Sequence, residues 1–268
     1  MNKIIDCITF FNENFIFDFR YEVIKDHVDY FVICESNFDH QGKAKKLNFN
    51  FEKYKNKNKI KYIIHDRPFP PSNNAWQNQA IQREFILENL DFLDDEDFIF
   101  FSDPDEIPNP ETLKNFQLKK KYGIFLQKNF NFKFNLFNPH ESPWDGPRVC
   151  KKKNLQSIDH MRQNIWAKNL KYKFYRIDKE KNIQLFDNAG WHFNNIMKPE
   201  DISLKLRTFA HNEYADEKYS SVDKIKQKIE KKIDLFDRGY QFVKVDLDDS
   251  FPKYLLDNQK FFNEFIIK

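Results

Sequence analysis

Cysteine, long apolar runs and excess charge are all scarce in this chain of 268 residues. The three cysteines, Cys7, Cys34 and Cys150, are odd in number and widely spaced, so we expect buried, reduced thiols in a reducing compartment. No apolar run approaches the roughly 20 residues that span a bilayer. An apolar strand pattern begins almost at Met1, which leaves no room for a signal peptide. These absences predict a soluble, cytoplasmic chain without a transmembrane segment.

The charges of the chain are nearly balanced. Lys and Arg together number 44 and Asp and Glu 41, which gives a net charge of +3. This balance provides little attraction to nucleic acid or to an anionic membrane. A nucleic-acid-binding module could use Arg148 and the lysines at 151–153, but the aromatic residues are scattered rather than grouped with these cations. We therefore expect no nucleic-acid partner, and function has to be inferred from particular sites.

Strand-like and helix-like segments alternate in the first half of the sequence. Short apolar runs predict strands at residues 4–11, 30–34, 59–64 and 98–101. Apolar residues at helical spacing predict a helix at residues 75–90, before the last of these strands. This alternation is typical of a mostly parallel sheet covered by helices. We predict an α/β fold whose first half, about residues 1–122, binds a nucleotide.

The pattern changes beyond residue 122. Residues 130–136 alternate apolar and polar side chains, which predicts a half-buried strand in a mixed sheet. Residues 138–148 are rich in proline and predict a loop that could cover a cleft. There is neither an internal repeat nor a long linker. We therefore predict a single domain over residues 1–245, with residues 246–268 packed on it as a C-terminal extension.

An acidic turn follows the last strand of the first half. Asp103 and Asp105 flank Pro104 directly after the apolar run, at the strand end where open α/β sheets bind ligands. Two carboxylates so placed suit Mg²⁺ or Mn²⁺, which take one or two carboxylates together with substrate phosphates. The alternative is a solvated turn, because Asp and Pro are common turn residues. The turn alone does not decide between them.

A second group of functional residue types surrounds His192. This histidine follows Gly190 and Trp191, and cationic residues come after it at Lys198, Lys205 and Arg207, followed by His211. An imidazole could complete a metal site, and the cations could neutralise a leaving diphosphate. The alternative is a structural histidine between two core aromatic residues. The acidic turn favours the functional interpretation.

Together these segments resemble glycosyltransferase family 17, which includes the β-1,4-mannosyl-glycoprotein β-1,4-N-acetylglucosaminyltransferases. The resemblance spans roughly residues 4 to 215 and is carried by short motifs in the family's order: Phe10-Phe11-Asn12-Glu13, Val32-Ile33-Cys34-Glu35-Ser36, Trp76 with Gln82-Arg83, Ser102-Asp103-Pro104-Asp105-Glu106-Ile107-Pro108, Trp144 with Gly146-Pro147, Gly190-Trp191-His192-Phe193, and Lys205 with His211 and Glu213.

The resemblance implies a GT-A fold with a Rossmann-like mixed sheet flanked by helices, a UDP-sugar donor that is expected to be UDP-N-acetylglucosamine, Mn²⁺ or Mg²⁺ as cofactor, and inversion at the anomeric carbon. Residues 123–245 would form the acceptor side. Asp103 and Asp105 match the family's Asp-x-Asp motif and would bind the metal and the diphosphate. His192 is the expected third metal ligand, with His211 as its rival.

The resemblance also suggests residues for the donor pocket. Phe11 and Asn12 would line the nucleotide site, and Glu35 would lie where such enzymes hold uridine or ribose. Arg83 would pair either with phosphate or with a site carboxylate. Lys198 is a candidate for the diphosphate and Trp191 for a sugar face, although Trp191 is as well explained as core.

An inverting transfer also needs a base for the acceptor hydroxyl. Asp187, just before the Gly-Trp-His segment, is the first candidate, and Glu141 and Asp145 in the 138–148 loop are the next. The acceptor is expected to be a glycan or glycoconjugate, such as a bacterial or viral surface polysaccharide. A metal-dependent nucleotidyltransferase or phosphohydrolase is the alternative enzyme class, because such enzymes also use paired aspartates.

Overall fold

The computed structural model describes residues 2–208 and 216–268. Its sheet runs in the order β11-β7-β6-β8-β4-β1-β2-β3, with β5, β9 and β10 paired off this path. The strands are β1 Ile4–Phe10, β2 Tyr30–Ser36, β3 Ile60–His65, β4 Phe98–Ser102, β5 Glu106–Pro108, β6 Tyr122–Asn131, β7 Leu136–Phe137, β8 Trp144–Lys151, β9 Ile183–Phe186, β10 Gly190–Asn194 and β11 Val243–Lys244. The helices are α1 Asn14–Ile24, α2 Ala75–Leu87, α3 Pro110–Lys114, α4 Ile158–Asn164, α5 Pro199–Thr208, α6 Glu217–Ser220, α7 Val222–Lys231 and α8 Lys253–Asp257.

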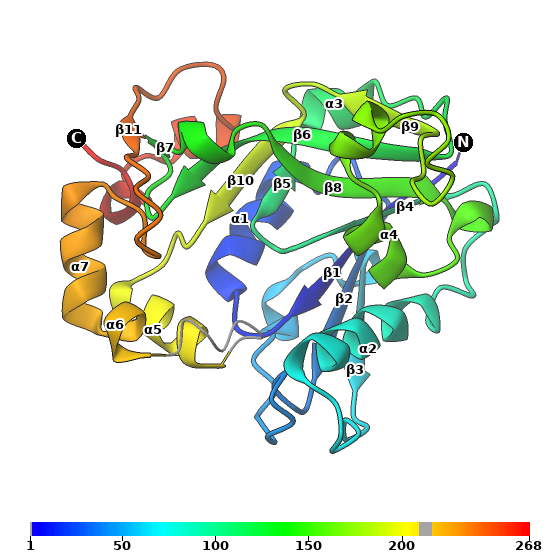
Figure 1. Cartoon of the computed structure of the whole chain (residues 1–268), viewed down its shortest axis with the longest axis horizontal. Helices are drawn as coiled ribbons and strands as arrows, with labels where there is room; N and C mark the ends of the chain where they lie inside the picture. Colours follow the sequence, from blue (N-terminus) through cyan, green and yellow to red (C-terminus); the bar gives the residue numbers. More distant parts are fainter. Residues whose placement is uncertain (1, 209–215) are drawn as a thin grey trace.

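The sheet changes from parallel to antiparallel at β4. Strands β3, β2, β1 and β4 pair in parallel, and β4 pairs with β8 in antiparallel orientation. The carboxyl ends of the four parallel strands therefore meet at one edge. This arrangement, visible in Figure 1, confirms the predicted Rossmann-like mixed sheet flanked by helices, as in a GT-A fold.

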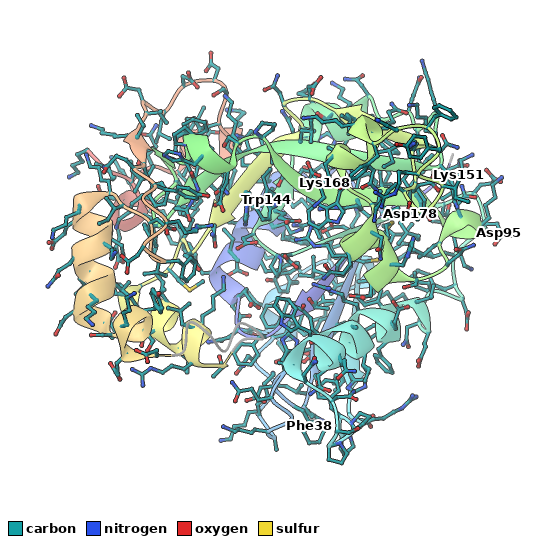
Figure 2. The ribbon with its side chains drawn as sticks, in the orientation of Figure 1. Phe38, Asp95, Trp144, Lys151, Lys168 and Asp178 are labelled. Atoms are coloured by element: carbon teal, nitrogen blue, oxygen red, sulfur yellow. The ribbon has the colours of Figure 1, made fainter. Side chains whose placement is uncertain are left out.

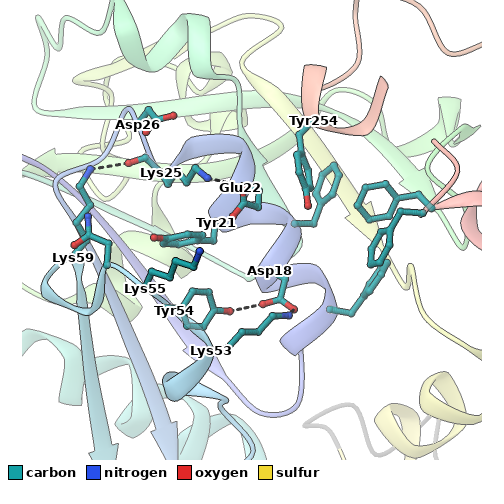
Figure 3. A pocket seen from close by; sticks show the side chains of 15 residues that line it. Asp18, Tyr21, Glu22, Lys25, Asp26, Lys53, Tyr54, Lys55, Lys59 and Tyr254 are labelled. Atoms are coloured by element: carbon teal, nitrogen blue, oxygen red, sulfur yellow. Dashed lines mark hydrogen bonds and ion pairs between the residues drawn. The ribbon is translucent and has the colours of Figure 1, made fainter. Parts of the chain in front are cut away.

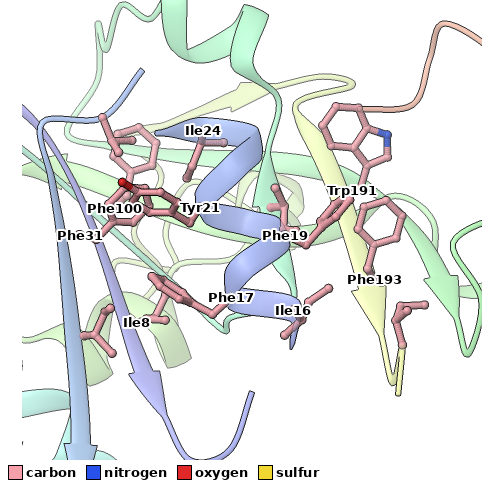
Figure 4. Close-up of a cluster of buried hydrophobic side chains, with 14 of the residues drawn as sticks. Ile8, Ile16, Phe17, Phe19, Tyr21, Ile24, Phe31, Phe100, Trp191 and Phe193 are labelled. Atoms are coloured by element: carbon pink, nitrogen blue, oxygen red, sulfur yellow. The ribbon is translucent and has the colours of Figure 1, made fainter. Parts of the chain in front are cut away.

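Helices cover both faces of the parallel part of the sheet. Alternate residues of a strand point to opposite faces, so Ile8 joins one buried cluster with Phe17 and Phe19 of α1, whereas Cys7 joins another with Ile86 of α2. The second cluster also contains residues of α4. Figure 4 shows the side chains of α1 between the parallel strands β1 and β2 on one side and β10 on the other. The sheet is thus a rigid layer that fixes where its strands end.

All three cysteines lie in the cluster beneath α2 and α4. Cys7, Cys34 and Cys150 are buried and free, as the sequence predicts. Burial raises the pKa of all three thiols above the ordinary value, to about 12 for Cys150. They are therefore core residues rather than nucleophiles.

The structure corrects the predicted strand at 130–136. β6 ends at Asn131, and the chain reverses before β7 begins at Leu136, with Phe132 at a φ of 65°. Phe132 and Phe134 are both buried, but in different clusters: Phe132 packs with α5 and α7, and Phe134 packs against Phe19. Two separate contacts therefore produced a period-two pattern that resembles a strand.

The predicted loop at 138–148 is also only partly a loop. Its last residues begin β8, which lies in the sheet between β6 and β4. The β6–β8 register shifts between Ile124 and Leu126, and Gly146 and Pro147 fall in this irregular stretch, where Arg148 resumes the pairing. A strand tolerates proline at such a position, because no ladder hydrogen bond is needed there.

The C-terminal residues pack against α1. Phe251, Leu255 and Phe262 belong to the same buried cluster as Phe17 and Phe19. None of the helices in the described part of the chain is long and apolar enough to cross a membrane.

Candidate active site

The acidic turn lies between β4 and β5, at the carboxyl edge of the parallel strands. Arg20 of α1, 83 positions away in sequence, is completely buried and holds this turn. Its Nη1 donates to the backbone oxygens of Glu106 at 2.7 Å and Asp103 at 3.3 Å. Its Nη2 donates to Ser102 Oγ at 2.8 Å, and its Nε donates to Asp6 Oδ2 at 2.7 Å. A planar guanidinium thus fixes the backbone that carries the two aspartates.

Glu106 forms a second buried contact beneath the turn. This carboxylate is completely buried and accepts hydrogen bonds from Arg162 Nη1 at 3.0 Å and Arg162 Nη2 at 2.7 Å. It also accepts one from Trp144 Nε1 at 2.7 Å. Figure 2 shows the position of Trp144 near the centre of the molecule. The bidentate arginine compensates the charge of a carboxylate that has no access to water.

Asp103 shares Arg162 with Glu106. Asp103 Oδ2 accepts from Arg162 Nη2 at 2.6 Å, and 37% of its side chain is exposed. Burial raises the pKa of Asp103, but Arg162 and Arg83 outweigh burial, so the pKa is lowered overall. This carboxylate is therefore ionised at neutral pH and open to a ligand.

Asp105 faces a different pair of cations. Its Oδ1 lies 3.5 Å from His192 Nε2, and its Oδ2 lies 4.0 Å from Lys205 Nζ. Burial opposes ionisation, but His192 and Lys205 lower the pKa of Asp105 to about 2. In return, the carboxylate raises the pKa of His192 above its ordinary value despite burial. The turn thus presents two ionised carboxylates within a ring of cations.

His192 reaches this site through strand pairing. β10 runs antiparallel to β5, with His192 opposite Glu106. The His192 ring lies 4.7 Å from the Trp144 ring, and its Nδ1 is buried without a hydrogen-bond partner among the described residues. A buried nitrogen without a partner is costly in a merely structural role. The structure therefore brings His192 and Asp105 together, and His211 lies outside the described residues.

The donor set fits a cation that substrate oxygens complete. Among the described residues, no three His, Cys, Asp or Glu side chains form a group able to enclose a metal ion. Mg²⁺ and Mn²⁺ do not need such a cage when a diphosphate supplies oxygens. Asp103 and Asp105 are ionised and separated by one residue. Nε2 of His192 faces Asp105, and Nδ1 of the same ring has no hydrogen-bond partner among the described residues. Asp103, Asp105 and His192 therefore stay the predicted metal ligands, and their chemistry suits Mg²⁺ or Mn²⁺.

Phe11 and Asn12 lie at the exit of β1, on the same edge of the sheet as the acidic turn. Their backbone nitrogens donate to Glu13 Oε2 at 2.7 and 2.9 Å. Burial raises the pKa of Glu13, although these two hydrogen bonds and Lys205 oppose it. Lys45 Nζ lies 5.2 Å from the centre of the Phe11 ring. The geometry keeps this segment beside the site, as a nucleotide pocket would require.

Glu35 is located as predicted, at the exit of β2, but it is completely buried. It accepts hydrogen bonds from Lys45 Nζ at 2.5 Å, Tyr62 Oη at 2.7 Å and the backbone nitrogens of Asn48 and Phe49 at 2.7 and 3.0 Å. These contacts give Glu35 a clear role in holding the segment after β2. Its contact with uridine or ribose stays a prediction.

Arg83 projects from α2 toward the same edge. Its Nη1 lies 2.7 Å from Asp159 Oδ1, so its ion pair is with a carboxylate outside the acidic turn. Its Nε is buried without a partner among the described residues. Arg83 also lowers the pKa of Asp103, second to Arg162. It is therefore close enough to act on the site electrostatically.

The structure separates Asp187 from this cluster. Asp187 is exposed on the turn between β9 and β10. The first residue of β10, Gly190, pairs with Pro108, which is the last residue of β5. His192 faces the other end of β5, at Glu106. A side chain beyond Pro108 does not reach the acidic turn, so the geometry gives no support to Asp187 as the base.

The other two predicted bases, Glu141 and Asp145, lie just before and at the start of β8. Glu141 Oε1 lies 2.6 Å from Arg238 Nη1, and its Oε2 accepts from Asn138 Nδ2 at 2.9 Å, so both oxygens are occupied. Asp145 Oδ2 accepts from the backbone nitrogen of Ala167 at 2.8 Å. Asp145 follows Trp144, which contacts His192 and Glu106. It is the candidate whose position fits the cluster best.

Two other predicted site residues lie away from the turn. Trp191 is buried in the core and points to the opposite face of β10 from His192, because neighbours along a strand alternate. Its Nε1 donates to the backbone oxygen of Ser250 at 3.0 Å. Lys198 is exposed just before α5 and borders a small surface pocket with Lys226 and Phe265. The structure places neither beside Asp103 or Asp105, which speaks against their predicted roles in the donor pocket.

Two residues of the site were missed by sequence reasoning. Arg20 and Arg162 are ordinary arginines of α1 and α4, and nothing in their neighbourhood along the chain marks them as buried. Lys205 belongs to the last motif of the family resemblance, but the sequence does not predict its contact with Asp105. The sequence signal that could have indicated them is Glu106 in the acidic segment. A buried carboxylate needs a cationic partner, which here had to come from another segment of the chain.

Comparisons with known proteins identify the family. The model of glycosyltransferase family 17 matches residues 1–245. Over 238 residues, the chain is 24% identical to the β-1,4-mannosyl-glycoprotein 4-β-N-acetylglucosaminyltransferase of Rattus norvegicus and 30% identical to that of Mus musculus. In both cases 76% of this chain is covered but only 42% of the relative, so the chain spans less than half the length of these relatives.

Among solved structures, HddC from Yersinia pseudotuberculosis is similar with a TM-score of 0.38 and 10% identity, covering 70% of this chain and 90% of that one. A likeness this weak assigns no function. The family model, in contrast, covers every strand of the mixed sheet and contains every residue of the acidic turn network. This chain belongs to glycosyltransferase family 17.

Proposed function

We propose that the protein is a metal-dependent, inverting glycosyltransferase that moves N-acetylglucosamine from UDP-N-acetylglucosamine to a hydroxyl of a glycan acceptor. The observation that carries this proposal is the turn of Asp103 and Asp105. Its two carboxylates are ionised, its backbone is held by Arg20, and it lies at the edge where open α/β sheets bind ligands.

In this proposal Asp103 and Asp105 would hold Mn²⁺ or Mg²⁺, and His192 would supply a further ligand. The bound cation would neutralise charge that develops on the UDP leaving group. Arg162 and Lys205 already face the two carboxylates at 2.6 and 4.0 Å, so they are positioned to stabilise the diphosphate from the protein side.

The same geometry gives roles to other residues of the chain. Phe11 and Asn12 would line the nucleotide pocket, since they leave β1 at the same edge. Asp145 would accept the proton of the acceptor hydroxyl, because Asp103 and Asp105 are committed to cations and Glu141 is committed to Arg238. The mannosyl acceptor named for the curated relatives suggests a mannose-containing glycan as the first acceptor to test.

A nucleotide panel tests the proposal. Thermal unfolding would be measured with UDP, UDP-N-acetylglucosamine, GDP-mannose and ATP, each with Mn²⁺ and with a chelator. A ligand that binds only the folded state raises its stability, so we expect an increase with the uridine diphosphates in the presence of Mn²⁺. Asp105→Asn should abolish this increase. Asp178→Asn is the matched control, because Asp178 is paired with Arg176 on the surface.

The contrary outcomes are distinct. A shift with ATP and none with uridine diphosphates would favour a nucleotidyltransferase or phosphohydrolase. An unchanged UDP-dependent shift in Asp105→Asn would remove the metal and diphosphate role of the acidic turn.

A further inference from the structure

A second cavity opens along the outer side of α1, apart from the candidate active site. Its volume is about 570 Å³, within the range of roughly 300–1,000 Å³ that is typical of small-molecule sites. Its walls come from α1, from residues 53–59 and from residues 254–262. Figure 3 shows Tyr54 and Lys53 on one side of α1 and Tyr254 on the other. No residue of the acidic turn or of its arginine contacts lines this cavity.

Aromatic rings make up much of the lining. Tyr21, Tyr54 and Tyr254 contribute rings from the three different segments, and Phe261 stands at the rim with 74% of its surface exposed. An exposed phenylalanine at the mouth of a cavity offers one free ring face. The C–H face of a pyranose ring packs well on such a surface, because it is the apolar side of an otherwise polar molecule.

The charged groups of the cavity are largely matched by one another. Asp18 accepts a hydrogen bond from Tyr54 Oη at 2.6 Å and is also paired with Lys53. Lys25 Nζ lies 2.6 Å from Glu22 Oε2. A third lysine of the lining, Lys59, donates to the backbone oxygens of Lys25 and Val28 at 2.8 and 3.0 Å. Three of the four ammonium groups in the lining are therefore occupied, which leaves little free positive charge for a phosphate or a nucleotide.

Hydroxyl groups remain available for a ligand. The hydroxyls of Tyr21 and Tyr254 take part in no hydrogen bond among the described residues, although both residues line the cavity. The carboxylates of Asp18 and Glu22 also retain acceptor capacity beyond their present partners. Aromatic faces beside polar groups that both donate and accept are the chemistry of a neutral, hydroxyl-rich ligand.

We infer that this cavity is a second saccharide-binding site, which holds a neutral part of the glycan acceptor outside the active site. The inference rests on the proposed function for the identity of its ligand. The cavity begins beside Phe15 in the first turn of α1, which directly follows the nucleotide-side segment at Phe11 and Asn12. One glycan could thus contact both places, with its reacting end at the acidic turn.

Binding of linear mannose and N-acetylglucosamine tetrasaccharides would be measured by calorimetry on the full chain, without metal or nucleotide. We expect binding of at least one of them. Phe261→Ala should weaken it about fivefold, the size of effect expected for the loss of one aromatic contact. Tyr254→Phe removes only a hydroxyl and should weaken it as well. The matched control is Phe174→Ala, because Phe174 is 91% exposed and does not line the cavity.

Each outcome has a definite meaning. Absence of binding by both tetrasaccharides, or equal affinity in Phe261→Ala and wild type, overturns the inference. Asp105→Asn should keep the tetrasaccharide affinity of the wild type. If saccharides bind at Phe261 while uridine nucleotides fail to bind, the proposed function falls and the second site stands. If uridine nucleotides bind and saccharides do not, the second site falls and the proposed function stands.

Discussion

Replacing Arg20 with lysine tests the most specific feature of the site, the clamp on the acidic turn. Lysine keeps the positive charge beside Asp6 but cannot reproduce the fork that contacts the Glu106 and Asp103 backbone oxygens and Ser102 Oγ. A hydrogen bond to a charged group contributes about 1.5–3 kcal/mol. Since lysine can regain part of these contacts, we expect a loss of about 2–4 kcal/mol in the free energy of unfolding.

Urea unfolding followed by tryptophan fluorescence measures this change. Arg176→Lys is the matched control, because Arg176 also makes two hydrogen bonds to one aspartate, at 2.7 Å each, but on the surface. We expect no measurable change in that control. Arg20→Lys should in addition lose part of the Mn²⁺-dependent stabilisation by UDP, since the turn would no longer be fixed. Wild-type stability together with wild-type UDP affinity in Arg20→Lys would refute the proposed clamp.

Three further predictions concern single positions. Trp144→Phe removes one donor from buried Glu106 without a large cavity, and urea unfolding should show a loss of about 1–3 kcal/mol; an unchanged midpoint would contradict the network. Gly123→Ala would place a methyl group 2.7 Å from Val149 Cγ1, so thermal unfolding should reveal a destabilisation of about 1–3 kcal/mol. Burial raises the pKa of Asp234, but Arg238 lowers it overall, so its stabilising effect is present above about pH 3.9 and is lost as pH falls below that value. Urea unfolding of Asp234→Asn should therefore differ from wild type at pH 6 and converge with it in acid, whereas a constant difference would argue against the ion pair.

The sequence predicts the acidic turn because all its determinants are local. The apolar run 98–101 fits a buried strand or a fragment of buried helix, and the acidic residues before it and the prolines after it favour the strand. The residues after a parallel strand lie at its carboxyl edge. Glu35 was located correctly by the same reasoning. Its surroundings were not, since they depend on Lys45 and Tyr62, which the fold brings from other segments.

The errors have the same physical origin. Asp187 is near His192 in sequence, but β10 leads the two residues to opposite ends of β5. The alternation at Phe132 and Phe134 has two unrelated causes in tertiary packing. Arg162 compensates the negative charge of Glu106 although the two residues are 56 positions apart in the sequence. No local sequence pattern predicts a pairing over that separation. Local geometry could be predicted, whereas the partners of buried charges could not.

The pairing of Arg162 with Glu106 and Asp103 also bears on synthesis of the protein. A nascent chain that has reached β8 already contains both carboxylates and Arg20, but it still lacks α4, β10 and Lys205. Until α4 emerges, the Glu106 carboxylate lacks the guanidinium that hydrogen-bonds to it, and burying it without that partner would be unfavourable. The centre of the sheet should therefore stay hydrated during translation and close only after the later segments have been made. We expect ribosome-bound chains truncated before α4 to remain sensitive to proteolysis near the acidic turn, and chains extended beyond Lys205 to resist it.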